Sequence, residues 1–475
     1  ALGGVGLLQG AHPGHALAAG AVQFRPNIYC LASGHPLLES YRTAVRVMRS
    51  RPPTDPTSWL AQANIHGAIS PPPGMLVDEC RHDATFFLSW HRMYLHFFER
   101  IVRQASGNPD FVLPYWGYSP TGRRTLPEPF RLPAAASNPL YTEHRFSLSN
   151  AGRNMQASAL DPGMALAELA FGGFTRAIDD TPHGTVHGAV GGLGGWMAAF
   201  ETAGRDPVFW LHHANIDRLW ELWLLGGGGR ANPTGDAAWM TTSFRFYDET
   251  GATVAMTGAQ VVDTAAQLGY QYADTSCLAI RLQEFDWKTL TRIDPIDPAL
   301  LQVFDPIRER PPLPDPPPLA VQEAVVLGAA PVELTLKLSP EAQRTLADFP
   351  TGAGKGNRLA LLLEGIRLQS PPAVYYEVYL NLPAGAGDPE YTSPHYAGNL
   401  SFFGPSPQGP HGKMPLTRSI GLLTTFARLR AVQQWRDDAV RVTFVPRAFV
   451  EGEDPAKLLG GQVQATVGSV TLRIE

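Results

Sequence analysis

The chain has 475 residues and a net charge of −5, and 44% of its residues are hydrophobic against 17% charged. This composition is typical of a folded protein with a sizeable core, and the length predicts two or three domains. The sequence contains no run of Lys and Arg and no uninterrupted apolar stretch of about 18 residues, so nothing in it favours nucleic-acid binding, anionic-membrane binding or a transmembrane helix. With 47 Gly and 43 Pro, the chain is rich in turns, which favours sheets and loops outside its helical regions.

The beginning of the chain is consistent with two interpretations. Residues 1–21 are small and apolar and end in Ala-Leu-Ala-Ala-Gly-Ala. They resemble the tail of a secretory signal, which predicts an exported (periplasmic or secreted) protein, but a flexible Gly/Ala-rich start of a cytoplasmic protein is an equal alternative. The three cysteines, Cys30, Cys80 and Cys277, are too few for a disulfide scaffold, although one pair can bridge.

Helix signals dominate residues 22–305. Thr54-Asp55-Pro56 offers an N-cap followed by Pro, and this helix is expected to end at His66-Gly67. Residues Ala84–Gln104 are apolar on nearly every side, as in a helix at the centre of a bundle. Asp206-Pro207 is a second N-cap with Pro at the helix start, and this helix is expected to run to the glycines at 226–229.

The second half of the chain has a different pattern. A proline-rich segment at residues 306–320, densest over Arg308–Pro318, predicts a stiff linker. Beyond it, residues 321–475 contain alternating or β-branched runs separated by turn residues, which predict an all-β domain of the sandwich or jelly-roll-like kind. The expected strands are Val332–Leu338, Ala373–Leu380, Ala439–Val445 and Gln464–Ile474.

Three histidines in the later part of the helical region have a spacing that suits metal binding. His183 and His187 are four residues apart, so on a helix they lie on one face, one turn apart, and can chelate one metal ion. His213, on the next expected helix, can face them and supply a third ligand.

A similar set of three occurs earlier. His91 lies within the apolar helix, where an unpaired imidazole would have an unfavourable desolvation free energy. His82 precedes this helix and His66 ends the helix before it, so the three can converge from neighbouring elements. Any one of these histidines is equally well interpreted as a packed or surface residue, but that interpretation does not explain why six of them cluster at helix ends.

The chemistry of the two sets favours copper. No Asp or Glu occupies a ligand position in either set. Imidazoles bind both copper and zinc, with copper the tighter. A zinc ion held by three histidines and a water would serve hydration or hydrolysis, which leaves a zinc hydrolase as one alternative. Two adjacent three-histidine sites without a carboxylate fit two-electron chemistry with O2 better.

Several segments resemble the type 3 copper family of tyrosinases, catechol oxidases and polyphenol oxidases. Phe87–Arg92 with Glu99 is similar to the first copper motif, and Pro182–His187 with Asp206–Trp220 is similar to the second. The resemblance covers nearly the whole chain and is closer before residue 272 than after it. Further segments similar to plant-type polyphenol oxidases are Pro114–Trp116, Ser243–Glu249, Leu268–Tyr270, Tyr376–Tyr379, Tyr396–Gly398 and Val442–Arg447.

This resemblance implies a four-helix-bundle dicopper domain with long loops at residues 22–305, including a middle region at 239–290, and a β-rich shielding domain at 321–475. It implies an enzyme that oxidises o-diphenols to o-quinones while reducing O2 to water, with small phenols and O2 as its partners. Adjacent helical residues point about 100° apart, and the family pattern selects His213 rather than His212. The implied ligands of the two copper ions are His66, His82 and His91 for the first and His183, His187 and His213 for the second.

The resemblance also implies roles for residues around the ligands. Cys80 precedes His82 by two residues, the spacing at which fungal tyrosinases and molluscan haemocyanins carry a thioether bond; a buried free thiol is the alternative. Cys30 and Cys277 are then left to form a disulfide in an oxidising compartment. Phe209 is expected to pack beside the imidazole one helical turn later. Phe200 occupies the position of a gate over the second copper, with a core aromatic as the alternative.

Residues near the second set bear on substrate choice. Gly184 follows the first ligand, where relatives that hydroxylate monophenols often carry an Asn that helps a Glu hold a base-activating water. Asp179 occupies the acidic position and is one carbon shorter, while Gly188 is expected to leave the mouth of the site open. These residues favour a catechol oxidase over a tyrosinase. The tyrosinase and a non-enzymatic, haemocyanin-like O2 carrier remain alternatives.

The family layout further implies a latent enzyme. The C-terminal domain is expected to cover the copper site until it is removed, with the exposed linker at Arg308–Pro318 as the cleavage region. Phe402 and Phe403 are the two candidates for the residue that covers the site.

Overall fold

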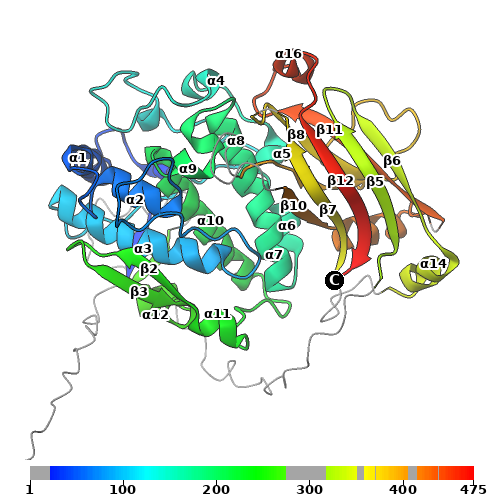
Figure 1. Ribbon diagram of the computed structural model, residues 1–475, viewed down its shortest axis with the longest axis horizontal. Helices are drawn as coiled ribbons and strands as arrows, with labels where there is room; N and C mark the ends of the chain where they lie inside the picture. The colour runs from blue at the N-terminus through cyan, green and yellow to red at the C-terminus, as the bar shows by residue number, and fades with distance from the viewer. Residues whose placement is uncertain (1–21, 274–316, 350–357, 370, 405–414, 437) are drawn as a thin grey trace, which may run out of the picture.

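The computed structural model describes residues 22–273, 317–349, 358–369, 371–404, 415–436 and 438–475. Residues 1–21, Cys277 and the predicted linker up to residue 316 therefore lie outside the described residues. A helical part (residues 22–273) and a β part (residues 317–475) lie against each other (Figure 1). No helix among the described residues combines the length and the apolar character that crossing a membrane requires.

The helical part is built around α2, α3, α8 and α10, with α1 packed along α3. Trp210 of α10 stacks on Phe98 of α3 with ring centroids 3.4 Å apart, so the two longest helices of the bundle are in close contact. The elements are β1 Gln23–Arg25, η1 Ile28–Cys30, α1 Pro36–Ser50, α2 Trp59–His66, α3 Phe87–Ser106, η2 Glu128–Phe130, α4 Ser147–Asn150, α5 Ala157–Leu160, α6 Gly163–Ala167, α7 Phe171–Ile178, η3 Asp179–Gly184, α8 Thr185–Gly191, η4 Trp196–Ala198, α9 Phe200–Ala203, α10 Pro207–Leu225, α11 Ala237–Thr241, β2 Ser243–Tyr247, β3 Thr253–Thr257, η5 Gly258–Gln260, α12 Thr264–Leu268 and β4 Tyr270–Tyr272.

Capping explains where the site-bearing helices begin. The predicted start of α10 is confirmed, because the Asp206 side chain accepts a hydrogen bond from the Val208 amide and Pro207 occupies the first turn. The predicted start of α2 is wrong by a few residues. Asp55 instead accepts hydrogen bonds from the amide and hydroxyl of Thr57, and the cap is Ser58, which accepts from the Ala61 amide.

A buried charge network fixes α3 against α10. Arg92 of α3 lies 2.5 Å from the Asp217 carboxylate of α10, and Arg25 of β1 lies 3.0 Å from Glu99 of α3. The hydroxyl of Tyr270, in β4, also donates to Asp217. Removing one partner of such a buried pair typically costs about 3–5 kcal/mol. The network therefore keeps the two longest helices of the site in a fixed register.

The β part is a sandwich of two four-stranded sheets, with strand orders β10-β7-β12-β5 and β6-β11-β8-β9. The predicted fold class, a helical bundle followed by an all-β domain, is confirmed. The four predicted strands correspond to β6, β8, β11 and β12. The elements are β5 Ala320–Leu327, β6 Val332–Lys337, α14 Pro340–Ala347, β7 Leu359–Leu368, β8 Val374–Leu380, β9 Tyr396–Leu400, β10 Leu416–Gly421, α15 Leu423–Ala431, β11 Ala439–Ala448, α16 Pro455–Leu459 and β12 Ala465–Ile474.

One sheet of the sandwich faces the helical part. Every residue of β8 is buried, because its two faces lie against different cores. Tyr376 packs in the core of the sandwich, whereas its neighbour Tyr375 packs with the core of the helical part. The same alternation occurs at Phe402, in the sandwich core, and Phe403, in the helical core, as expected for extended backbone. The β part is thus anchored on the bundle through side chains that point out of its own core.

Candidate metal centre

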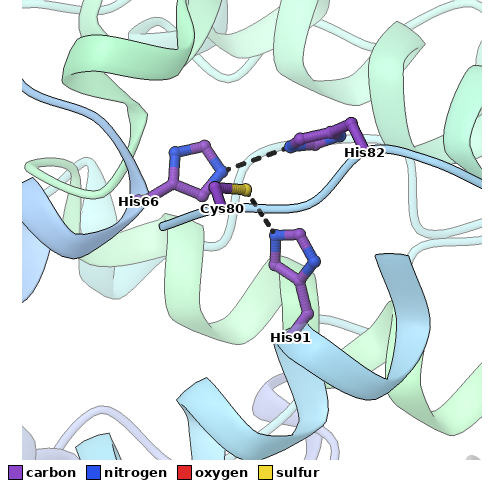
Figure 2. A group of neighbouring side chains, drawn as sticks. All are labelled: His66, Cys80, His82 and His91. Carbon is purple, nitrogen blue, oxygen red and sulfur yellow. Dashed lines mark hydrogen bonds between the residues drawn. The ribbon is translucent and has the colours of Figure 1, made fainter. Parts of the chain in front are cut away.

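The first histidine group, His66, His82 and His91, converges from three elements. His66 is the last residue of α2, His91 lies in the second turn of α3, and His82 lies on the loop between them (Figure 2). The ring centroids are 5.3–5.6 Å apart in all three pairs, and the Nε2 atoms of His66 and His82 are 3.5 Å apart. The three imidazoles therefore surround one small volume, as the sequence predicted.

The second histidine group, His183, His187 and His213, is equally compact. Its ring centroids are 4.6 Å, 5.0 Å and 5.6 Å apart. His187 lies in α8 and His213 in α10, but His183 precedes α8, in the η3 turn, where Thr181 has non-helical backbone angles. The prediction that His183 and His187 occupy one helical face is therefore only approximately met, although their rings adjoin as expected.

The two groups form a single centre. The ring of His91 stacks on that of His213 with centroids 4.3 Å apart and planes inclined by 5°. On the other side, His82 and His183 have centroids 5.3 Å apart. Six imidazoles from four helices, one turn and one loop thus line one buried pocket, and five of the six side chains belong to residues that are no more than 3% exposed.

Hydrogen bonds at Nδ1 fix the orientation of most of these rings. A carbonyl oxygen only accepts, so an Nδ1 bonded to it must carry the proton. In the neutral imidazole, Nε2 then keeps its lone pair free for a metal ion. The Nδ1–carbonyl pairs are His66 with Phe200 at 2.9 Å, His91 with Phe87 at 2.7 Å, His187 with Met197 at 2.8 Å and His183 with Asp179 at 3.0 Å.

The electrostatics of the pocket suit a metal ion held by neutral ligands. Burial lowers the pKa of the imidazoles of His66, His82, His91, His187 and His213, so these rings are neutral near pH 7. The Nε2 atoms of the whole second group are buried without a hydrogen-bond partner among the described residues. Leaving such atoms unpaired is costly, and a bound metal ion satisfies them. All-imidazole donors fit copper well.

His212 lies closer to the second group than helical geometry predicted. One nitrogen from each of His183, His187, His212 and His213 lies within 4.8 Å of the others, although neighbouring helical residues point in different directions. His212 and His213 differ in what their rings contact. His212 Nδ1 is 3.2 Å from the Tyr118 hydroxyl, whereas the His213 ring stacks on the first histidine group. The selection of His213 as the shared-pocket ligand therefore remains our prediction.

Three predicted neighbours of the ligands lie beside the pocket. Phe209 packs against His213 with ring centroids 4.3 Å apart, as expected. Phe200 stacks on His82 with ring centroids 4.3 Å apart, so its ring lies against the first histidine group rather than over the second. The Cys80 sulfur lies 3.6 Å from Nε2 of His91 (Figure 2), and its thiol is free. The thioether to His82 stays a prediction.

Cys30 is disulfide-bonded, and the predicted partner, Cys277, lies outside the described residues. The same limit applies to the predicted cleavage segment around residues 308–316.

The Asp179 carboxylate contacts His82 and His183. Its side-chain oxygen lies 3.1 Å from Nδ1 of His82 and 3.0 Å from Nδ1 of His183. Burial raises the pKa of its carboxyl group, but the adjacent His82 and His183 lower that pKa by more, so the group is an anion. The Asp179 oxygen thus contacts two imidazoles directly, and its assignment to the acidic position of the family stays a prediction.

The predicted open mouth at Gly184 and Gly188 is filled by the β part. A Cβ atom added to Gly184 would lie 2.3 Å from the hydroxyl oxygen of Ser401, and one added to Gly188 would lie 2.3 Å from the ring of Phe449. Ser401 and Phe449 were not predicted from the sequence, because both lie more than 200 positions later in the chain and reach the site only through the packing of the two parts.

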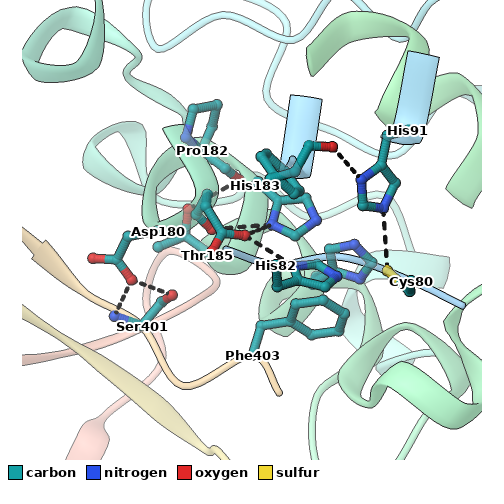
Figure 3. Close-up of polar contacts among 12 residues, drawn as sticks. Cys80, His82, His91, Asp180, Pro182, His183, Thr185, Ser401 and Phe403 are labelled. Atoms are coloured by element: carbon teal, nitrogen blue, oxygen red, sulfur yellow. Dashed lines mark hydrogen bonds and ion pairs between the residues drawn. The ribbon is translucent and has the colours of Figure 1, made fainter. Parts of the chain in front are cut away.

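Phe403 covers the histidines. Its ring stacks on His187 with centroids 3.7 Å apart and planes inclined by 14°, and it also contacts His183 and His82 (Figure 3). The rings of Phe200 and Phe403 pack edge to face, with centroids 4.8 Å apart. Of the two candidates named from the sequence, Phe402 faces the sandwich core, so Phe403 is the one that meets the pocket.

Comparison with known protein families places three matches along the chain. The common central domain of tyrosinase matches residues 56–165 and 133–225, and the polyphenol oxidase middle domain matches residues 234–282. A domain of unknown function (DUF7868) matches residues 319–459 of the β part.

Individual relatives agree with these matches. A tyrosinase from Hahella sp. (strain CCB-MM4) is 28% identical, covering 95% of this chain and 99% of the relative. A chloroplastic polyphenol oxidase from Malus domestica is 27% identical over 86% of this chain and 73% of its own length. The latent form of a chloroplastic polyphenol oxidase from Prunus armeniaca is 32% identical, over 50% of this chain and 47% of its own.

Solved structures show the same two-part fold. Latent apple tyrosinase superposes with a TM-score of 0.63 at 24% identity, covering 96% of this chain and 98% of that one. A latent aurone synthase (polyphenol oxidase) from its natural source gives a TM-score of 0.64 at 23% identity, with coverages of 96% and 90%. With the matched domains in this order and six histidines in one pocket, the chain belongs to the type 3 copper polyphenol oxidase family.

Proposed function

We propose that this protein oxidises o-diphenols to o-quinones with O2 as the electron acceptor, so that two catechols and one O2 give two o-quinones and two water molecules. The observation that carries the proposal is the single pocket of six imidazoles, whose second group has buried Nε2 atoms without a hydrogen-bond partner among the described residues. We assign the first copper ion to His66, His82 and His91 and the second copper ion to His183, His187 and His213.

When bound, such a copper pair supplies O2 binding and two-electron transfer from the phenol. The residues of this chain hold the ligands in place, because main-chain carbonyls accept hydrogen bonds from the Nδ1–H groups of His66, His91, His183 and His187. Neutral ligands leave the positive charge of the metal pair uncompensated, so a phenolate is attracted to it. The aromatic walls around the pocket exclude water from the reacting centre.

The preference for diphenols follows from Asp179 and Gly184. A catechol is oxidised without insertion of an oxygen atom, whereas monophenol hydroxylation is favoured by a carboxylate that holds a water near the phenol. The Asp179 oxygen is already engaged by two imidazoles, and Gly184 offers no side-chain amide to hold a water. Monophenol hydroxylation is the second candidate function, because a relative that matches this chain nearly end to end is named a tyrosinase.

We also propose that the intact chain is latent, with the β part as the shield. A phenol has to reach the histidines, and the Phe403 ring stacks on His187 and also contacts His183 and His82. The β part is held next to the pocket by hydrogen bonds. The Ser401 amide and hydroxyl both donate to the Asp180 carboxylate (Figure 3). Arg418 donates to the Phe403 carbonyl oxygen at 2.6 Å. Cleavage in the predicted linker at Arg308–Pro318 is the proposed release step.

We further propose that the protein works outside a reducing cytoplasm. The disulfide bond at Cys30 supports this location, since such bonds persist in oxidising compartments. Several plant relatives are likewise named as chloroplastic proteins. Thiol titration of the protein purified under non-reducing conditions tests this directly. We expect one reactive thiol in the unfolded chain if Cys80 is free and none if Cys80 forms the thioether, and three reactive thiols would refute the proposed location.

The activity is tested by loading the purified chain with copper in air and measuring its metal content, optical spectrum and rate of catechol oxidation before and after limited proteolysis. We expect two copper ions per chain, slow oxidation by the intact chain and fast oxidation after cleavage. A zinc-loaded chain that hydrolyses esters, or a copper-loaded chain that binds O2 but never oxidises catechol, would refute the proposal. Comparing the rate and lag on a monophenol with those on its catechol distinguishes the two candidate functions.

A further inference from the structure

His82 differs from the other proposed ligands in how it is held. The other five lie on a helix or a helical turn, whereas His82 lies on the irregular loop between α2 and α3. Four of those five have Nδ1 bonded to a main-chain carbonyl, but Nδ1 of His82 is bonded to a side chain, the carboxylate of Asp179, at 3.1 Å. A loop residue has no helical backbone to fix it, so the orientation of this imidazole depends on Asp179 more than that of any helical ligand does.

The same carboxylate oxygen reaches the other histidine group. Oδ1 of Asp179 lies 3.0 Å from Nδ1 of His183, which also bonds to the Asp179 carbonyl oxygen. One oxygen atom is therefore shared by one imidazole from each group. Asp179 is itself well placed for this contact, because it is the C-cap of α7 and the first residue of the η3 turn that carries His183.

We propose that Asp179 is a positioning residue that ties the two copper sites together by accepting an Nδ1 hydrogen bond from one ligand of each. This inference rests on the proposed copper pair. A carboxylate in this position fixes the tautomer, aims both Nε2 atoms into the pocket and raises the basicity of both ligands. It also restricts the distance between a ligand of the first copper ion and a ligand of the second. A base that activates a water would instead need this oxygen to be free.

The neighbouring carboxylate provides a matched control. Asp180 also lies in the η3 turn and is buried, but its Oδ1 accepts from the amide and hydroxyl of Ser401 and faces the shield (Figure 3). Burial raises the pKa of the Asp180 carboxyl to about 6, although Arg418 and the hydrogen bonds from Ser401 oppose this, in contrast to the lowered pKa of Asp179. Substitutions of the two adjacent aspartates therefore test different features: Asp179 the metal centre, and Asp180 the contact between the helical part and the β part.

The test is the Cu(I) affinity of the full chain, measured by competition with bathocuproine disulfonate, for wild type, Asp179→Ala, Asp179→Asn and Asp180→Asn. Loss of a carboxylate that orients a metal ligand typically weakens metal binding by about 10- to 100-fold. We expect a loss of this size at both copper sites for Asp179→Ala, a smaller loss for Asp179→Asn, which keeps one acceptor oxygen, and wild-type affinity for Asp180→Asn. The increase in melting temperature that copper causes should be smaller in the Asp179 variants than in wild type, measured for each variant against its own metal-free form.

Two results would overturn the inference. If Asp179→Ala binds two copper ions as tightly as wild type and loses only monophenol hydroxylation, Asp179 is a water-activating base. If Asp180→Asn weakens copper binding as much as Asp179→Ala, the effect is a general disturbance of the η3 turn. Failure of the proposed function has a different signature, because the wild-type chain itself would then not bind two copper ions.

Discussion

Truncating the Phe403 ring should convert the latent chain into an active one without cleavage. Phe403 is 4% exposed, and its ring lies against His187, His183 and Phe200 when the shield is in place. Burial of a phenylalanine side chain contributes about 1.5–3 kcal/mol, and contacts between aromatic rings add about 0.5–1.5 kcal/mol. Phe403→Ala therefore destabilises the closed state by at least about 2 kcal/mol, which raises the population of the open state by roughly 30-fold or more.

The assay is the initial rate of quinone formation from catechol, with the copper content and the intact mass of each sample checked. We expect intact Phe403→Ala to approach the rate of proteolysed wild type. The control is Phe402→Ala, which removes a ring of equal size that packs against Tyr376 in the sandwich core. If both variants activate the chain equally, loosening of the β part is sufficient and the argument from the Phe403 ring is refuted. An intact Phe403→Ala chain as slow as wild type would refute it as well.

Three further predictions concern the same site. Gly188→Ala should raise the rate of catechol oxidation by the intact chain, because the added Cβ would lie 2.3 Å from the Phe449 ring and push the β part away. Gly34→Ala is the control, since a Cβ added there meets open space and should leave the rate unchanged. Equal rates of these two variants would contradict the prediction. His213→Ala should bind one copper ion per chain and His212→Ala two, as measured by elemental analysis; one copper ion in His212→Ala would assign that residue as a ligand instead. The metal-free chain should lose stability as the pH falls below about 6.5. In the unfolded chain His66, His82, His91, His187 and His213 take up protons, whereas in the folded chain their lowered pKa keeps them neutral, and each histidine lowers the free energy of unfolding by up to about 1.4 kcal/mol per pH unit. A melting temperature that stays constant from pH 7.5 to 5.5 would contradict this.

The parts of the site that the sequence predicted are those set by local signals. The Asp206-Pro207 cap fixes where α10 begins and therefore which way His213 faces. The spacing of His183 and His187 brings their rings together even though His183 lies in a turn outside the regular helix. Local capping also explains the error at α2, since the sequence offers both Asp55 and Ser58 as caps, and Asp55 is occupied by Thr57.

The parts that escaped prediction depend on packing between distant segments. Nothing near Gly184 or Gly188 in the chain indicates that Ser401 and Phe449 fill the space above them. Strands β5, β7, β9 and β10 were not predicted either, and one of them, β7, lies at the centre of its sheet between β10 and β12. The one usable signal was the alternation at Phe402-Phe403, where one of two adjacent aromatic residues on extended backbone must leave the sandwich core.

The position of Asp179 also required the folded chain. The family resemblance placed Asp179 at the acidic position near the second histidine group but did not indicate what its carboxylate contacts. The structure brings the His82 loop, nearly 100 positions earlier, onto the oxygen atom that also contacts His183. A loop residue makes contacts that no helical or strand period predicts, so the shared hydrogen bond became visible only in three dimensions.

The measurement that tests the central claim most directly is a crystal structure of the copper-loaded chain with anomalous data collected at the copper edge. We predict two copper peaks in one pocket, one bound by Nε2 of His66, His82 and His91 and the other by Nε2 of His183, His187 and His213. A single metal peak, or a second peak outside these six imidazoles, would contradict the account.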